Sequence, residues 1–466
     1  MSGTIVRMTR SVCPVCLKNI EAAMTREEDG RIYLEKSCPE HGSFRTLVWQ
    51  GLVDPELWTV SSEPLAPGKG LACPGNCGIC GEHEMGTCCA LLEVTQRCNL
   101  RCRFCFADGG SGSKDPDVDE VKEMIRDIVR QCGDPLLQLS GGEPTLRDDL
   151  PELVRFAKEA GCSYVQINTN GIRLAEDPAY VQRLKEAGLD IVFLQFDGTR
   201  EEIYEKLRGR RLLETKLAAI RTCAACGLGV TLVPTVVPGV NDDDLGALVR
   251  LAVSLSPDVK GIHFQPVSYF GRIPAEEIPE ERYTLDRLMA DLSDQAGIAM
   301  DSFMPSRCDH PLCGFHADFL ISPSGSLKAL SSITHSSSSR GTARDNREYV
   351  ARHWIRQEEQ AAPLQAAAPE NPASNEAIPE DPSRKENVQK KPLQAAAMDD
   401  DMDFDTFLYR LKHNRLTLSS MAFQDAMNLN IERLHRCTLH VYDNGKIMPF
   451  CAKYLTPVVP AHAEQR

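Results

Sequence analysis

The sequence predicts an α/β fold, a partial (β/α)6 TIM-like barrel flanked by smaller cysteine-rich regions. Three observations predict it. Short apolar runs alternate with amphipathic patterns of helical period between residues 90 and 304, as buried parallel strands and their connecting helices do. Cysteines gather in groups on both sides of this block. A stretch rich in Ser, Ala, Pro, Glu and Gln interrupts the C-terminal part.

Six apolar runs are the predicted barrel strands, and amphipathic segments between them are the predicted helices. The strands are 90–95, 136–139, 164–168, 191–196, 230–237 and 262–267, and the clearest helices are 118–132, 150–160 and 179–187. Gly133, Gly161 and Gly188 follow these helices, as stop signals do. Catalytic groups of such barrels lie at the C-terminal ends of strands, so the residues after each run are the candidate site residues.

The chain divides into five predicted parts. They are a small module at 1–60, a cysteine-rich connector at 61–89, the barrel at 90–304, a C-terminal region at 305–330 and 401–466, and an insertion at 331–400. Within the insertion the segment Pro-Leu-Gln-Ala-Ala-Ala occurs at 363–368 and again at 392–397. So polar and repetitive a stretch buries too little apolar surface to offset its ordering entropy, and we expect it to be disordered.

Composition excludes several classes of protein. The 466 residues carry a formal net charge of −14 without an evident basic patch, so we expect no nucleic-acid partner. No run of about 18 apolar residues predicts a transmembrane segment, and residues 1–10 lack the apolar core of a signal peptide. The 19 cysteines lie mostly in groups with metal-site spacing, which favours metal binding in a reducing cytoplasm, under anaerobic conditions, over a disulfide framework.

Cys98, Cys102 and Cys105 form the most informative motif. They follow the first predicted strand with the spacing C-x-x-x-C-x-x-C, and an aromatic residue precedes the last of them. A [4Fe–4S] cluster normally takes four cysteine ligands, so three thiolates on one loop leave one iron free to hold another molecule. The alternative is a structural zinc knuckle.

This motif, together with Ser-Gly-Gly-Glu-Pro at 140–144, resembles the radical S-adenosylmethionine (SAM) superfamily. The resemblance implies that the open iron chelates the amino and carboxylate groups of SAM. It also implies SAM contacts from residues after the second, third and fourth strands. The candidate cofactor-binding residues are Gly141, Gly142, Glu143, Asn170, Gln195 and Asp197. Turn or capping roles for these residues stay open, and no catalytic residue is assigned.

Two further groups have metal-site spacing. Cys13, Cys16, Cys38 and His41 offer two pairs of ligands, which suits structural zinc or a mononuclear iron. The N-terminal module is too small to fold well without such a metal. The connector repeats the C-x-x-x-C-x-x-C spacing and adds a fourth cysteine, as a closed auxiliary [4Fe–4S] cluster requires. Its candidate ligands are Cys73, Cys77, Cys80 and Cys88.

Several segments, among them 37–42, 73–78, 194–199 and 431–437, look like the radical SAM group that contains tetraether lipid synthase and the archaeal dihydropterin methylase. A bacterial branch, the TrsS radical SAM (seleno)proteins, looks similar in size and N-terminal motif. The resemblance implies a C-terminal auxiliary-cluster region, with a second auxiliary cluster on Cys308, Cys313, Cys437 and Cys451. The insertion has no counterpart that we can match, and Thr438 stands where a second cysteine often follows in the group.

The resemblance also implies a reaction. A reductant such as flavodoxin or ferredoxin reduces the cluster, SAM is cleaved to methionine and a 5′-deoxyadenosyl radical, and the radical removes a hydrogen atom from a C–H bond. Methylation or carbon–carbon bond formation is the expected outcome. The substrate, whether a small molecule, a lipid or a peptide, does not carry over from the resemblance.

Three other interpretations stay open at this point. An iron–sulfur electron-transfer protein would bind clusters without releasing 5′-deoxyadenosine. A zinc-ribbon interaction module would be colourless and free of labile sulfide. A radical SAM maturase that modifies peptides would usually carry a peptide-recognition domain, and no winged-helix pattern is visible in the sequence.

Overall fold

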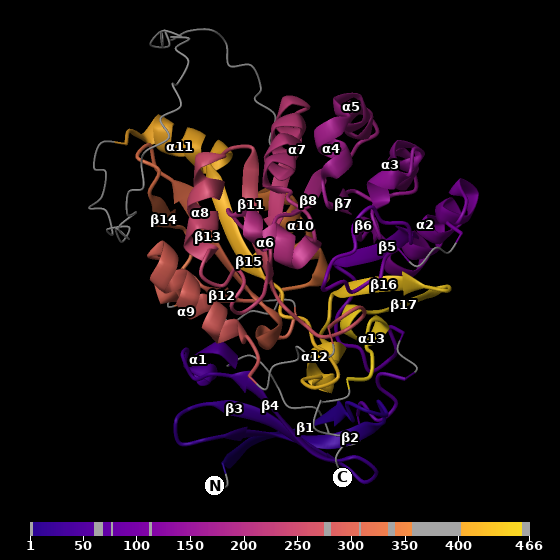
Figure 1. Ribbon diagram of the computed structural model, residues 1–466, viewed down its shortest axis with the longest axis vertical. Helices are drawn as coiled ribbons and strands as arrows, with labels where there is room; N and C mark the ends of the chain where they lie inside the picture. The colour runs from indigo at the N-terminus through magenta and orange to yellow at the C-terminus, as the bar shows by residue number, and fades with distance from the viewer. Residues whose placement is uncertain are drawn as a thin grey trace.

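The computed structural model describes residues 3–59, 69–75, 78–110, 114–274, 281–306, 309–333, 341–356 and 402–458. A small antiparallel sheet lies below a large curved sheet that is surrounded by helices (Figure 1). None of the described helices combines the length and the apolar character that crossing a membrane takes.

The N-terminal module is a four-stranded antiparallel sheet in the order β1-β2-β3-β4. Its strands are β1 (Thr4–Val12), β2 (Asn19–Arg26), β3 (Ile32–Cys38) and β4 (Gly42–Trp49), and the short helix α1 (Pro55–Thr59) follows them. Alternate residues of β3 are buried, as in a strand with one covered face. The Trp58 indole N–H donates to the Pro311 carbonyl at 2.9 Å, and the Asp286 carboxylate accepts the backbone N–H groups of Gln50 and Leu52. These bonds dock the module on the rest of the molecule.

All six predicted barrel strands are confirmed as neighbouring parallel strands. They are β5 (Cys89–Thr95), β6 (Leu136–Gly141), β7 (Val165–Thr169), β8 (Ile191–Gln195), β9 (Gly229–Val233) and β11 (Val259–Pro266), with β10 (Thr235–Val236) beside the end of β11. The residues of strand β6 show what each face of the sheet contacts. Leu137 and Leu139 join the large hydrophobic core, whereas Gln138 and Ser140 line cavities on the concave side.

Two strands from the C-terminal region extend the parallel set to eight. Strand β15 (Arg415–Ser420) pairs with β11 at one edge, and β16 (Leu439–Asp443) pairs with β5 at the other. Antiparallel strands complete both ends of the sheet. They are β12 (Met304–Pro305), β13 (Phe315–Ile321) and β14 (Leu327–Ala329) beyond β15, and β17 (Lys446–Pro449) beyond β16. The described strands form an open path rather than a closed ring, so the partial barrel is confirmed and is larger than six strands.

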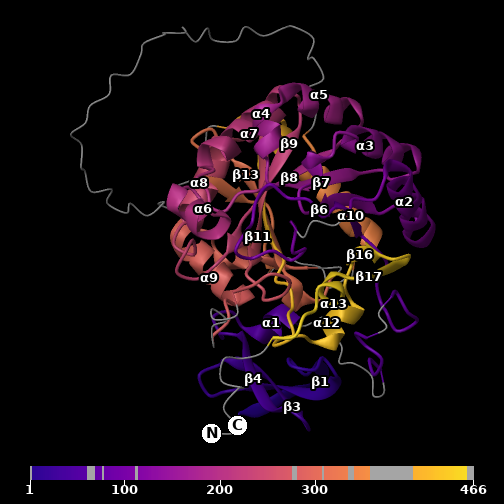
Figure 2. The same ribbon diagram turned by 45° about the vertical axis from the view of Figure 1, so that its right-hand side comes forward.

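Helices form an arc around the parallel strands (Figure 2). They are α2 (Val118–Cys132), α3 (Leu150–Glu159), α4 (Ile172–Glu176), α5 (Pro178–Glu186), α6 (Glu201–Arg208), α7 (Leu213–Ala225), α8 (Leu245–Ser254) and α9 (Leu285–Ala296). Helix α2 has the predicted bounds, because Asp117 and Glu120 form a capping box at its start and Gly133 follows its last residue at φ +76°.

Helix α10 (Ala343–Trp354) corrects the expectation that 331–400 is disordered throughout. A capping box between Thr342 and Asp345 starts the helix. The helix is mostly polar, and only a few of its residues, among them Val350 and Trp354, are buried. Composition alone therefore could not predict that it packs on the barrel. Most of the predicted insertion, 334–340 and 357–400, lies outside the described residues.

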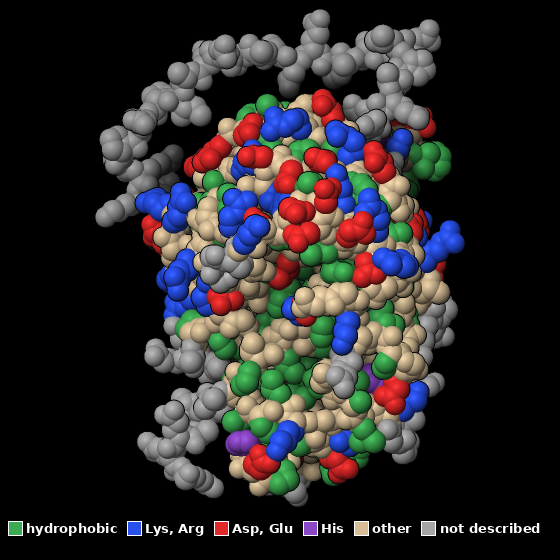
Figure 3. Space-filling view, turned by 90° about the vertical axis from the view of Figure 1, so that its right-hand side faces the viewer, with side chains coloured by type: hydrophobic (Ala, Val, Ile, Leu, Met, Phe, Trp, Pro, Cys, Tyr) green, Lys and Arg blue, Asp and Glu red, His purple; other side chains and the backbone are tan. Residues whose placement is uncertain are grey.

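Three helices belong to the C-terminal region: α11 (Phe404–His413), α12 (Ile431–His435) and α13 (Phe450–Lys453). The last two lie between the barrel and the N-terminal sheet (Figure 1). Short 3-10 turns occur at Pro144–Leu146, Met300–Ser302 and Pro311–Cys313. Figure 3 shows one face of the molecule, where acidic and basic side chains are interspersed over its upper half and hydrophobic side chains gather in a hollow below them.

Candidate active site and metal centres

Cys98, Cys102 and Cys105 lie on the loop after β5 and line one pocket of about 200 Å³. Burial, together with the charges of Glu143, Cys102 and Cys105, raises the pKa of Cys98 to about 11. The three thiols are therefore close enough to influence one another in a poorly solvated site. Such a group favours a bound metal centre, since coordination stabilises thiolates that burial disfavours.

Arg272 holds the cysteine loop in place. Its backbone exchanges hydrogen bonds with the backbone of Cys105 at 3.1 and 2.9 Å, and its Nε donates to the Cys102 carbonyl at 3.0 Å. These bonds tie the loop after β5 to the loop after β11. The two loops are therefore linked at the pocket. The sequence contained no signal for this role, because 167 residues separate Arg272 from Cys105.

Gly141 is the last residue of β6, Gly142 follows it, and both line the same pocket. A Cβ on Gly141, whose φ is +123°, would lie 2.1 Å from the Thr95 carbonyl oxygen, and one on Gly142 would lie 2.3 Å from the Arg97 carbonyl oxygen. Both positions therefore require glycine, because any side chain there would prevent the close approach of the cysteine loop to the end of β6. This packing role accompanies the predicted contact with SAM.

Glu143 and Asn170 also line the pocket, and their polar groups are largely used within the protein. The Glu143 carboxylate is buried and accepts hydrogen bonds from the Thr169 hydroxyl at 2.7 Å and the Asn170 backbone N–H at 2.6 Å. The Asn170 amide donates to the Asn99 side chain at 2.7 Å. Glu143 thus ties the C-terminal ends of β6 and β7 together near the cysteine loop.

Gln195 ends β8 and connects the cysteine loop to a buried lysine. Its Nε2 lies 3.9 Å from the Cys102 Sγ, and its Oε1 accepts from the Lys216 ammonium at 3.2 Å. Lys216 also donates to the Asn170 carbonyl. Complete burial lowers the pKa of Lys216 to about 8. Sequence reasoning missed this lysine, which lies within α7 like an ordinary helix residue.

The predicted contact of Asp197 with the cofactor stays a prediction, and the structure shows another partner for this residue. Asp197 does not line the pocket, because its buried carboxylate is paired with the Arg208 guanidinium at 2.7 and 2.5 Å. It also accepts the Thr235 backbone N–H at 3.2 Å. Arg208, which sequence reasoning missed, lines the pocket instead. Burial acts to lower the pKa of Arg208, but the charges of Asp197 and Cys102 raise it above its ordinary value.

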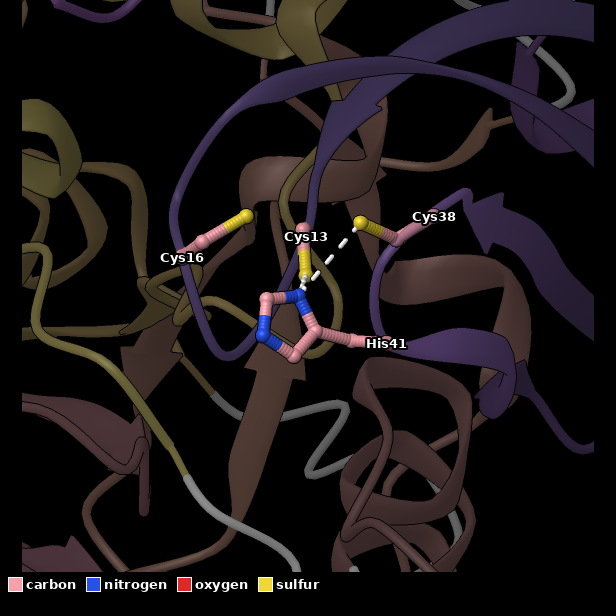
Figure 4. A group of neighbouring side chains, drawn as sticks. All are labelled: Cys13, Cys16, Cys38 and His41. Atoms are coloured by element: carbon pink, nitrogen blue, oxygen red, sulfur yellow. Dashed lines mark hydrogen bonds between the residues drawn. The ribbon is translucent and has the colours of Figure 1, made fainter.

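Cys13, Cys16, Cys38 and His41 converge at one end of the N-terminal sheet (Figure 4), with their ligand atoms within 4.8 Å of one another. The His41 Nδ1 lies 3.6 Å from the Cys13 Sγ and 3.5 Å from the Cys38 Sγ. Burial acts to raise the pKa of Cys38, but hydrogen bonds from Glu40 and His41 lower it to about 6. Three thiols and one imidazole fit a tetrahedral zinc or a mononuclear iron.

Removing this metal should unfold the N-terminal module. In Cys16→Ala we expect the loss of one equivalent of bound metal per chain and rapid proteolysis within residues 3–59. Structural zinc contributes on the order of 10 kcal/mol to the folding of small domains. Elemental analysis and limited proteolysis measure the two effects, with Cys132→Ala as the control. If Cys16→Ala retained the metal and resisted protease, these four residues would not be its ligands.

The connector cysteines are only partly brought together among the described residues, and Cys77 lies outside them. The Cys73 Sγ lies 3.4 Å from the His435 Nε2, and these two residues and Glu82 have ligand atoms within 4.8 Å of one another. Cys80 is exposed, and the Cys88 Sγ accepts from the Asn346 amide at 3.3 Å. A four-cysteine cluster here stays a prediction. Glu82 and His435, at the edge of this site, were missed by sequence reasoning.

The C-terminal cysteines are gathered across the insertion, apart from Cys308, which lies outside the described residues. Burial raises the pKa of Cys313, of Cys437 and of Cys451, the last to about 12, and the charges of Cys313 and Cys451 also raise the pKa of Cys437. Cys313 and Cys451 are buried and Cys437 is half-buried, so all three thiols are poorly solvated. Next to it, the Thr438 hydroxyl donates to the Asp309 carboxylate at 2.7 Å, which explains how a threonine is accommodated there.

Two known families match this chain, one in the barrel and one in the N-terminal module. The family described as "Radical SAM superfamily" matches residues 92–252. The family described as "HMPTM N-terminal zinc ribbon domain" matches residues 5–50. The first match contains the three-cysteine loop, and the second contains Cys13, Cys16, Cys38 and His41.

Known proteins match over different lengths. The 7,8-dihydro-6-hydroxymethylpterin dimethyltransferase of Methanocaldococcus jannaschii is 32% identical over 480 residues, covering 96% of this chain and 92% of that protein. The GTP 3′,8-cyclase of Limosilactobacillus fermentum is 32% identical over 213 residues, or 44% of this chain and 61% of that protein. The crystal structure of methylornithine synthase is 17% identical, with a TM-score of 0.36, over 48% of this chain and 65% of that one.

Proposed function

Because the chain belongs to the radical SAM superfamily, in the group of the archaeal dihydropterin methylase, we propose that it methylates a reduced 6-hydroxymethylpterin. The chain is an enzyme of the radical SAM methylase type, and SAM and a [4Fe–4S] cluster are its cofactors. The relative that supports the pterin substrate aligns with nearly the whole chain, including the N-terminal module. The GTP 3′,8-cyclase aligns with only 44% of this chain, so its substrate is a less well supported candidate.

One observation carries the proposal: three thiols of a single loop share a pocket with polar groups from three barrel strands. We assign Cys98, Cys102 and Cys105 as the ligands of the SAM-binding cluster, which leaves one iron open. Gly141, Gly142, Glu143, Asn170 and Gln195 form the SAM side of the pocket, and Asp197 positions Arg208 behind it.

The cluster and SAM, when bound, supply a 5′-deoxyadenosyl radical that removes a hydrogen atom from the substrate. The protein's own residues do the rest. Phe106, Phe423 and Phe450 close one side of the pocket, with the Phe423 and Phe450 rings stacked at 4.4 Å between centroids. Such an apolar wall excludes water, which protects a reactive intermediate. Arg272 and Glu143 hold the loops that carry the pocket in register.

The remaining metal centres complete the proposal. We assign Cys313, Cys437 and Cys451, with Cys308, to one auxiliary cluster, and Cys73, Cys77, Cys80 and Cys88 to another. The burial of Cys313 and Cys451 supports an electron-transfer role, since desolvation and nearby charge set cluster potentials. Radical SAM enzymes need a reductant, for which we propose flavodoxin or ferredoxin in the cytoplasm, where reducing conditions preserve clustered thiols.

The product tests this function. Reconstituted under anaerobic conditions and supplied with a reductant, 6-hydroxymethyl-7,8-dihydropterin and excess SAM, as the source of both the radical and the methyl groups, the protein should form a pterin heavier by one or two methyl groups. Mass spectrometry detects it, and omission of the reductant is the control. Release of 5′-deoxyadenosine without any methylated pterin would exclude this substrate, and no release at all would favour an electron-transfer protein.

A further inference from the structure

A second cavity, of about 740 Å³, lies on the concave side of the sheet beside the cysteine pocket. We call it the inner chamber. Residues common to the two linings are Phe106, Asn168, Phe193, Gln265, Phe423 and Phe450. A molecule held in the inner chamber therefore faces the place where the SAM-binding cluster and its radical are expected. The chamber is large enough for a small organic substrate.

Helix α10 forms the floor of the inner chamber, across the N-terminal ends of the strands. The Asn346 amide donates to the Cys88 Sγ beside the start of β5, and the Tyr164 hydroxyl, just before β7, donates to Glu348. At the other end of the helix, the Arg356 guanidinium pairs with Asp258 at 2.7 Å, just before β11. The floor is thus anchored at both sides of the sheet.

Three aromatic rings pack together above this floor. The Trp354 ring lies 4.9 Å from the Phe193 ring and 5.7 Å from the His263 ring, and the last two are 5.3 Å apart. All three line the inner chamber. Aromatic groups prefer offset-stacked or edge-to-face neighbours, so this cluster offers a surface for another flat ring.

Two polar atoms in the lining have no hydrogen-bond partner within the protein. They are the Trp354 Nε1 and the Ser420 Oγ, on side chains that are 7% and 4% exposed. A buried donor without a partner is unfavourable by about 1–3 kcal/mol, so buried polar groups are normally satisfied. Both residues line the chamber, so a ligand there is the candidate partner for these atoms. A third polar group, the Asn168 amide, already donates to Gln138 at 3.3 Å.

Carboxylates outnumber cationic side chains in the described lining of the inner chamber. The Asp318 carboxylate accepts hydrogen bonds from the Thr417 and Tyr349 hydroxyls, both at 2.7 Å. Burial lowers the pKa of His263 to about 4, so this imidazole is neutral near pH 7. Arg352 is the one basic residue among the described lining residues, apart from the histidines. Such a wall provides little for an anionic group such as a phosphate.

We propose that the inner chamber binds the substrate as a flat, uncharged heteroaromatic ring, stacked on the Trp354–Phe193 surface and hydrogen-bonded by the Trp354 Nε1–H and the Ser420 hydroxyl. This inference rests on the proposed function, which makes that ring a dihydropterin. A pterin carries several ring nitrogens and a carbonyl group, which match an indole donor and a hydroxyl. Trp354 and Ser420 are then specificity-determining residues.

Equilibrium dialysis of the reconstituted holoenzyme with 6-hydroxymethyl-7,8-dihydropterin tests the inference, with SAM present and no reductant. Trp354→Phe keeps a ring but removes the N–H, and Ser420→Ala removes the hydroxyl. Each should weaken pterin binding about five- to tenfold, which is the loss of one hydrogen bond. Trp58→Phe is the matched control, because its N–H bonds to Pro311 outside the chamber. Thermal unfolding checks that each variant is folded, and GTP serves as the charged probe.

The outcomes separate the two levels of the proposal. Weaker binding in both variants, with an unchanged control and no binding of GTP, supports the chamber assignment. If both folded variants bind the pterin as the wild type does while methylated pterin still forms, the chamber assignment is wrong and the proposed function stands. Absence of pterin binding to the wild type, or equal binding of GTP, also overturns the assignment. Failure to release 5′-deoxyadenosine overturns the proposed function itself.

Discussion

Replacing Cys102 by alanine should reduce the release of 5′-deoxyadenosine by more than about 1,000-fold, or about 4 kcal/mol in the activation barrier. With two thiols left on the loop, the cluster loses one of its three protein ligands and cannot be held with a single open iron. Cys102 is the buried member of the loop, beside Gln195 and Arg208, so water cannot easily replace the missing sulfur.

The measurement is chromatographic analysis of the nucleoside after reduction with dithionite under anaerobic conditions, together with iron content. Cys226→Ala is the matched control, since Cys226 lies at the end of α7 and does not line the pocket. Its nucleoside release should equal that of the wild type. Undiminished release by Cys102→Ala would remove the basis for assigning the three-cysteine loop to the SAM-binding cluster.

Replacing Asp197 by alanine should destabilise the barrel by about 3–5 kcal/mol, because the Arg208 charge would remain buried without its partner. The side chains of both residues are almost completely buried, at 0% and 3% exposure. Their two hydrogen bonds also fix the Arg208 guanidinium against the pocket. We therefore expect weaker SAM binding in addition to lower stability.

Urea unfolding followed by circular dichroism measures the change in stability. Asp243→Ala is the control, because its ion pair with Arg200 lies at the surface, where such pairs contribute about 0–1 kcal/mol. Asp197→Asn should fall between the two, since it keeps the shape and loses the charge. Equal effects of Asp197→Ala and Asp243→Ala would contradict a structural role for the buried pair.

Local patterns in the sequence predicted a large part of this fold. The six apolar runs are six neighbouring strands, and α2 has its predicted bounds. The pairing of Cys13 and Cys16 with Cys38 and His41 also followed from spacing, and the structure brings the four together. Strand periodicity, helix caps and ligand spacing are properties of neighbouring residues, so one sequence is enough to read them.

Contacts between distant parts of the chain were not predictable in this way. Strands β15 and β16 join the barrel from beyond the insertion, and the polar helix α10 closes the inner chamber with Trp354. The place of Asp197 after a strand also gave no sign that its carboxylate pairs with Arg208.

The sequence by itself determined the class of this protein, since the Cys98, Cys102 and Cys105 loop and the Gly141–Gly142 turn are short motifs whose chemistry depends on spacing alone. Only the tertiary structure decided what surrounds the reaction: the eight parallel strands of the large sheet, the buried ion pair and the inner chamber with its aromatic floor. The physical reason is that charge pairing, burial and cavity shape depend on which side chains meet in space. These tertiary contacts form between residues that lie far apart along the chain.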